Sequence, residues 1–115
     1  VVAKAEDVAG VKVLVAVLEG MDAKSLRTTM DDLKNKLGSA VILLAVAGDK
    51  IQFCAGVTKD LTGRIKAGEL VNAAAAVAGG KGGGKPDMAM AGAADVAKLA
   101  DAMKAARTFI GEKLA

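Results

Sequence analysis

The sequence predicts a single α/β (α+β) domain in which a mixed β-sheet is covered by about three helices. Three observations lead to this fold class. A chain of 115 residues has the length of one domain with its own hydrophobic core. Hydrophobic residues make up 53% of the chain and charged residues 25%, which is typical of a folded protein. Apolar runs with the period of strands and runs with the period of helices follow one another along the chain.

The first predicted elements are a strand and a helix. Val11–Leu18, VKVLVAVL, is apolar at nearly every position and rich in β-branched residues, so we expect an interior strand. Residues 1–8 form either a first strand that turns at residues 9–10 or an irregular lead-in, and we favour the strand. Asp22 then caps a helix that ends at Gly38. Its apolar stripe consists of Leu26, Met30, Leu33 and Leu37. Its outer face, which we interpret as solvated, carries Lys24, Arg27, Asp31, Lys34 and Lys36.

A β-hairpin is predicted next. Ala40–Ala47, AVILLAVA, is a second buried strand, and the turn at residues 48–49 leads back into Ile51–Val57, IQFCAGV. One face of this third strand is less apolar, as expected near a sheet edge or under a thin helical cover. Cys54 has no histidine or second cysteine near it in the sequence, so we interpret it as a small packing residue.

The second half predicts two more helices and a short strand. Residues 58–70 contain a turn and begin a helix that continues to Gly79, with four alanines at 73–76 that allow close packing. After Pro86, the alternating DMAMA predicts a small strand. Asp95 caps a final helix. Its apolar stripe consists of Val96, Leu99, Met103, Ala106, Ile110 and Leu114.

Composition limits the function. The chain has no histidine, which excludes histidine-dependent catalysis. Two phenylalanines and no tryptophan or tyrosine argue against base stacking on aromatic side chains. The net charge of +3 favours polyanionic partners. A single cysteine, no secretory leader and no long apolar run predict a cytoplasmic protein that neither enters a membrane nor forms an internal disulfide.

The stretch GGKGGGKPDMAMAGA, residues 79–93, is the strongest candidate for a site. A glycine loop can turn successive backbone N–H groups towards one phosphate, to which a lysine adds charge. The pattern of a P-loop is absent, and the run follows a helix, unlike a dinucleotide fingerprint. The alternative, a flexible connector, is disfavoured by the alternating residues after Pro86 and by nearby basic residues. The predicted phosphate-binding surface consists of Lys59, Arg64, Lys66, Gly79, Gly80, Lys81, Gly82, Gly83, Gly84 and Lys85.

The same residues carry a family resemblance. GGKGGGKPDMAMAGA, together with GVKVLVAVLEG, LRTTMDDLKNKLGSAVILLA, AGVTKDLTGRIKAGELV and the closing amphipathic helix, resembles the C-terminal domain of bacterial alanyl-tRNA synthetases, called C-Ala. The resemblance covers residues 1–115. A more distant similarity runs to the accessory domain of DHH-family phosphoesterases, whose glycine motif is followed by a histidine. The chain departs from the usual C-Ala pattern at Lys85, Met90 and Ala93, where arginine, glutamine and glycine are common.

The resemblance implies a globular tRNA-binding module without catalytic residues. Such a module contacts the tRNA elbow and helps bring tRNA(Ala) to the aminoacylation and editing sites, which lie elsewhere in the enzyme. ATP, Mg and Zn would serve those other parts, so no cofactor, metal or small-molecule substrate is expected in this chain. An alternative function is an oligomerisation module with little RNA affinity of its own, built on the alanine-rich helix or the last helix. An independent enzyme has little support, because no acid–base pair or nucleophile constellation stands out.

Overall fold

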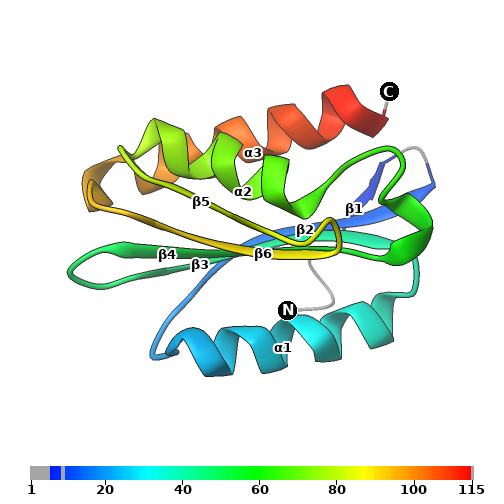
Figure 1. Ribbon diagram of the computed structural model, residues 1–115, viewed down its shortest axis with the longest axis horizontal. Coiled ribbons are helices and arrows are strands. Elements are labelled where there is room, and N and C mark those ends of the chain that lie inside the picture. The colour runs from blue at the N-terminus through cyan, green and yellow to red at the C-terminus, as the bar shows by residue number, and fades with distance from the viewer. Residues whose placement is uncertain (1–5, 9, 115) are drawn as a thin grey trace.

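In the part of the chain that the structure describes, six strands form one mixed sheet with a helix on one face and two helices on the other (Figure 1). The computed structural model describes residues 6–8 and 10–114. The strand order across the sheet is β1-β2-β3-β4-β6-β5. In chain order the elements are β1 (Glu6–Val8), β2 (Val11–Leu18), α1 (Ala23–Leu37), β3 (Ala40–Ala47), β4 (Ile51–Val57), α2 (Ala67–Val77), β5 (Lys81–Gly84), β6 (Met88–Ala93) and α3 (Leu99–Leu114), with short 3₁₀ turns at Lys59–Leu61 and Val96–Lys98.

This architecture confirms the predicted fold class. Strands β2 and β3 run parallel, whereas the other described pairs are antiparallel, so the sheet is mixed. The parallel pair is joined by α1, as a crossover connection requires. A first strand before residue 9 is also confirmed for Glu6–Val8, whereas residues 1–5 of that prediction lie outside the described residues.

The core is divided by the sheet into two apolar layers. Leu14, Ile42 and Leu44 point to the α1 side and pack with Leu26 and Met30, all fully buried. On the other side, strand residues such as Leu43 and Phe53 pack under α2 and α3. Because side chains alternate along a strand, a strand that is apolar throughout fills both layers. Burial of each large side chain stabilises the fold by about 1.5–3 kcal/mol.

The helix α1 has the predicted limits and packs unusually close to β4. The side chain of Asp22 accepts a hydrogen bond of 2.8 Å from the backbone N–H of Ser25, and Gly38 ends the helix with a φ of 79°. A Cβ atom at Gly56 would collide with the Sδ atom of Met30. Strand β4 lies between β3 and β6, so of the two explanations for its less apolar face the sheet edge is wrong and the helical cover is right. Its less apolar face lies under a closely packed helix.

The alanines of α2 permit close packing against α3 and the end of the sheet. Ala74 and Ala75 are fully buried, in agreement with the close packing predicted from the four alanines at 73–76. Asp95 caps the last helical segment by accepting a hydrogen bond from the N–H of Ala97. No helix in the described ranges, 6–8 and 10–114, has both the length and the apolar character needed to cross a membrane.

Candidate nucleic-acid interface

The glycine run forms an edge strand, and the predicted phosphate-binding loop is therefore wrong in its conformation. Lys81–Gly84 is β5, which pairs antiparallel with β6 at one end of the sheet. Successive N–H groups of a strand point in opposite directions, so they cannot converge on one phosphate. The amide of Gly82 instead donates a hydrogen bond of 2.8 Å to Oδ1 of Asn72 in α2. The turn of the hairpin is closed by mutual backbone hydrogen bonds between Lys85 and Met88.

Alternate glycines of this run are required by the close approach of β5 to β6. A Cβ atom at Gly80 or Gly82 would collide with the β6 backbone, and one at Gly84 would also lie too close to it. A Cβ atom at Gly83, in contrast, would meet no described atom within 4 Å. Gly79 adopts a φ of 77° directly after α2 and turns the chain into the strand. Gly80, Gly82 and Gly84 thus allow the close pairing of the hairpin strands.

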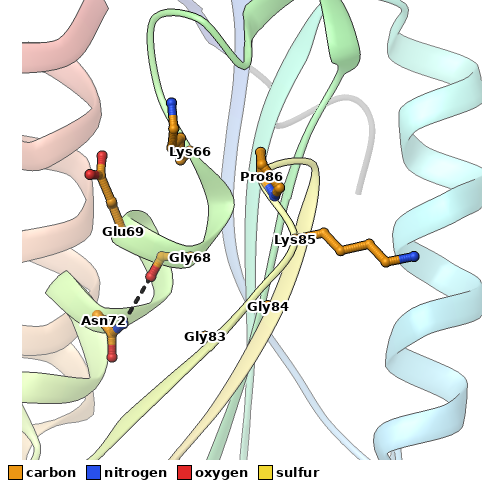
Figure 2. A pocket seen from close by; sticks show the side chains of 8 residues that line it. All are labelled: Lys66, Gly68, Glu69, Asn72, Gly83, Gly84, Lys85 and Pro86. Carbon is orange, nitrogen blue, oxygen red and sulfur yellow. Dashed lines mark hydrogen bonds between the residues drawn. The ribbon is translucent and has the colours of Figure 1, made fainter.

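The two lysines of the run lie on the side of the sheet that α1 covers. Lys81 pairs with Gly92 and Gly83 pairs with Met90, while Met90 in turn pairs with Cys54 of β4. Cys54 and Met90 belong to the apolar layer under α1, so residues 81 and 83 face the same way. Figure 2 shows the side chain of Lys85 extending towards α1.

Two cations of α1 join this surface. Arg27 directs its Nε–H at the sulfur of Met90, with an Nε–Sδ distance of 3.2 Å. The ammonium of Lys34 donates a hydrogen bond of 3.0 Å to the backbone carbonyl of Asp87 in the hairpin turn. We call this surface the α1-side shelf. It consists of Arg27, Lys34, Lys81, Gly83, Lys85, Met88, Met90 and Gly92.

The α1-side shelf contains an open pocket with a volume of about 390 Å³. Arg27 and Lys85 supply its positive charge, and the hairpin supplies the rest of its lining. The sequence interpretation placed Arg27 and Lys34 on a solvated helix face and missed this role. Their spacing of seven residues puts them on one side of α1. Nothing in the spacing, however, shows that β6 lies beside that side, because the β4–β6 pairing joins segments far apart in the chain.

Lys66 lies on the opposite side of the hairpin from Lys85. It lines a smaller cleft of about 230 Å³ between the start of α2 and the hairpin, with Gly68, Glu69, Asn72, Gly83, Gly84, Lys85 and Pro86 (Figure 2). A Cβ atom at Gly68 would touch the backbone of Gly84 at 3.8 Å, so α2 begins very close to β5. Lys66 and Lys85 therefore border the same hairpin from its two faces.

The remaining two predicted cations are not brought to the hairpin. Arg64 donates a hydrogen bond of 2.8 Å to the backbone carbonyl of Leu114 at the end of α3, which occupies its guanidinium in stabilising a helix terminus. Lys59 belongs to the 3₁₀ turn that follows β4. Neither residue lines either cleft at the hairpin. The fold therefore separates Lys59 and Arg64 from the other residues of the phosphate-binding surface predicted from the sequence.

Cys54 is a packing residue, as predicted. Its side chain is fully buried, and burial raises the pKa of the thiol to about 11, an effect that the nearby Arg27 only partly opposes. The thiol is therefore protonated at neutral pH and a poor nucleophile. Among the described residues, no three histidine, cysteine, aspartate or glutamate side chains are placed to share a metal ion.

This sheet with its basic hairpin is a DHHA1 domain: the DHHA1 family matches residues 10–112, and the chain belongs to that family. Within it, the chain is 60% identical over 114 residues to an alanine–tRNA ligase of Albidiferax ferrireducens, covering 98% of this chain and 13% of the ligase. It is 54% identical over 113 residues to the alanine–tRNA ligase of Shewanella loihica, covering 97% of this chain and 13% of that ligase. In both, it corresponds to the C-terminal region and spans about an eighth of the ligase.

A solved structure shows the same fold. The crystal structure of the C-Ala domain from Aquifex aeolicus alanyl-tRNA synthetase matches with a TM-score of 0.82 and 30% sequence identity. The match covers 96% of this chain and 97% of that domain. The resemblance to C-Ala and the predicted mixed sheet with three helices are thereby confirmed.

Proposed function

We propose that the chain is the tRNA-binding C-terminal module of an alanine–tRNA ligase. In this proposal it contacts the tRNA elbow and helps bring tRNA(Ala) to the aminoacylation and editing sites located elsewhere in the enzyme. The observation that carries the proposal is the α1-side shelf, where cations from two distant segments lie on one side of the sheet: Arg27 and Lys34 of α1, and Lys81 and Lys85 of the β5–β6 hairpin. Residues 1–115 would then form one tRNA-binding unit.

The proposed mechanism is electrostatic. Each phosphate that a lysine or arginine neutralises releases condensed counterions, so affinity falls steeply with salt. Residues 81 and 85 are four strand positions apart, which places their Cα atoms about 13 Å from one another. They can therefore contact separate phosphates of a folded RNA. Structured RNA is recognised largely by shape and by its backbone, which suits a surface of point charges.

Catalysis is assigned to other parts of the ligase in this proposal. ATP, Mg and Zn would act there, and this module would supply binding and positioning in the cytoplasm. Holding the tRNA at its elbow lowers the entropic cost of delivering its acceptor end to a distant active site.

Charge reversal tests the proposal directly. The double variant Lys81→Glu/Lys85→Glu should bind tRNA(Ala) at least tenfold more weakly than the wild-type chain at low salt, with a flatter salt dependence. The double variant Lys98→Glu/Lys104→Glu makes the same change in charge in the α3 region and should have a much smaller effect. A filter-binding titration at two salt concentrations, with an unrelated tRNA in parallel, gives both quantities. Equal weakening by the two double variants would contradict a hairpin site.

Self-association is a second candidate function, favoured by a groove between α2 and α3. The groove has a volume of about 520 Å³ and is lined by the apolar Ala73, Val77, Ala105 and Phe109. Asp101, Lys104 and Glu112 border it, and charges of both signs along α3 suit a two-fold contact with a second copy. Sedimentation equilibrium over a range of concentrations distinguishes this function: a stable dimer that Phe109→Glu dissociates, without tRNA affinity, would favour assembly over binding.

A further inference from the structure

Helix α1 leaves one strip of the sheet open on its own side. Met30 of α1 and Cys54 of β4 are fully buried between the helix and the sheet, but Met88 and Met90 of β6 are only half-buried. Beyond them, Gly83 of β5 has no described atom within 4 Å of the place where a side chain would stand. The strip is therefore flat and apolar at its centre.

Cations stand along the border of this strip. Arg27 of α1 lies beside the sulfur of Met90, and Lys85 follows β5 on the same side. Both line the 390 Å³ pocket together with Gly83, Gly84, Met88, Ala89 and Met90. Asp31 and Asp87 are the carboxylates that lie near these cations in the sequence. The backbone carbonyl of Asp87 accepts a hydrogen bond from Lys34. A flat apolar floor with a cationic border matches a planar ring that carries a phosphate.

We propose that this strip binds one unpaired nucleobase of the RNA, with that nucleotide's phosphate held by Arg27 and Lys85. The proposal rests on the proposed RNA-binding function and names a contact within it. The positive border favours a polyanion over an apolar peptide. The lining side chains of Met88 and Met90 have no N–H or O–H group with which to read a base edge, so binding should tolerate any base.

Methionine and arginine take the place of the aromatic residues that the sequence lacks. A thioether makes favourable contacts with aromatic rings, and a guanidinium plane stacks on unpaired bases. Both groups are present here within 3.2 Å of each other. The scarcity of aromatic side chains therefore disfavours stacking on aromatic rings, but a base can still stack on methionine and arginine.

Two RNA hairpins of equal charge test the proposal. One carries a single bulged uridine, and the other carries an abasic site at the same position. The wild-type chain should bind the uridine hairpin about fivefold more tightly, because only the base is missing from the second probe. Both affinities should show the same dependence on salt.

A blocking variant locates the contact. Gly83→Leu places a side chain in the open strip without changing charge. It should therefore reduce the preference for the uridine hairpin over the abasic hairpin to less than about twofold. Its affinity for the abasic hairpin should stay at the wild-type value. Gly63→Leu is the matched control, because a Cβ atom there also meets no described atom within 4 Å. It should keep the full preference, and circular dichroism should show both variants folded.

Each other outcome has a defined meaning. Equal wild-type affinity for the two hairpins overturns the nucleobase contact and leaves the proposed function standing. A full preference in Gly83→Leu overturns the location on the strip. If neither RNA hairpin nor tRNA binds, both proposals fail, and a protein segment becomes the expected occupant of the open strip.

Discussion

At the scale of single residues, Cys54 shows how burial decides chemistry. Its thiol has no exposed surface, and burial holds its pKa at about 11. Iodoacetamide should therefore leave Cys54 unmodified in the folded chain at pH 7.5 and modify it fully in denaturant. Mass spectrometry of the two samples checks this. Rapid labelling of the folded chain would show that the β4–β6 region opens readily.

Adjacent glycines of β5 should respond in opposite ways to the same substitution. Gly82→Ala forces a Cβ atom against the β6 backbone and should destabilise the fold by about 1–3 kcal/mol. Gly83→Ala meets open space and should be neutral or stabilising by up to about 1 kcal/mol, through lower entropy of the unfolded chain. Urea denaturation of both variants measures the difference. Similar losses at both positions would contradict the described pairing of β5 with β6.

At the scale of elements, the N-terminus of α1 links stability to pH. Hydrogen bonds from Ser25 lower the pKa of Asp22, so the folded state favours the ionised carboxylate. A lowered pKa contributes stability that is present above the unfolded value, near pH 4, and is lost as the pH falls through the folded value. Asp22→Ala should lower the Tm at pH 7, and the difference from wild type should shrink as the pH drops below about 4.

Asparagine at the same position separates the two contributions. It remains a good helix cap but does not titrate. The Tm of Asp22→Asn should therefore lie above that of Asp22→Ala at pH 7 and lack this part of the acid dependence. Thermal scans between pH 2.5 and 7 provide the comparison. Identical pH profiles for wild type and Asp22→Asn would show that this carboxylate is not linked to folding.

Most elements could be predicted from the sequence, because their apolar residues repeat with the period of a strand or a helix. Strands β2, β3 and β4 have the expected limits for this reason. Strand β5 could not be predicted, since its residues KGGG carry no apolar pattern. Its conformation is imposed by β6 and by the hydrogen bond from Gly82 to Asn72. The local sequence does not indicate a strand here, because pairing with β6 determines the conformation of β5.

At the scale of the whole molecule, the sheet order determines which charges share a surface. The sheet order places β6 and β5 beyond β4 (Figure 1). Arg27 and Lys34 of α1 therefore contact the hairpin and share one side of the sheet with Lys81 and Lys85. The same topology sends Arg64 to the end of α3. The sequence indicated the basic glycine segment, as a loop, but its charges were grouped by their distance along the chain. Only the tertiary arrangement shows that α1 supplies two of the four cations of the shelf.

Two arginines of equal charge therefore test the central claim most directly. The measurement is the salt dependence of tRNA(Ala) binding by Arg27→Gln and Arg64→Gln, with the Tm of each variant recorded as a control for folding. Arg27→Gln should weaken binding and reduce the slope of log K against log salt by about 1, as for the loss of one phosphate contact. Arg64→Gln should retain the wild-type slope. A reduced slope for Arg64→Gln with an unchanged slope for Arg27→Gln would contradict an RNA surface on the α1 side.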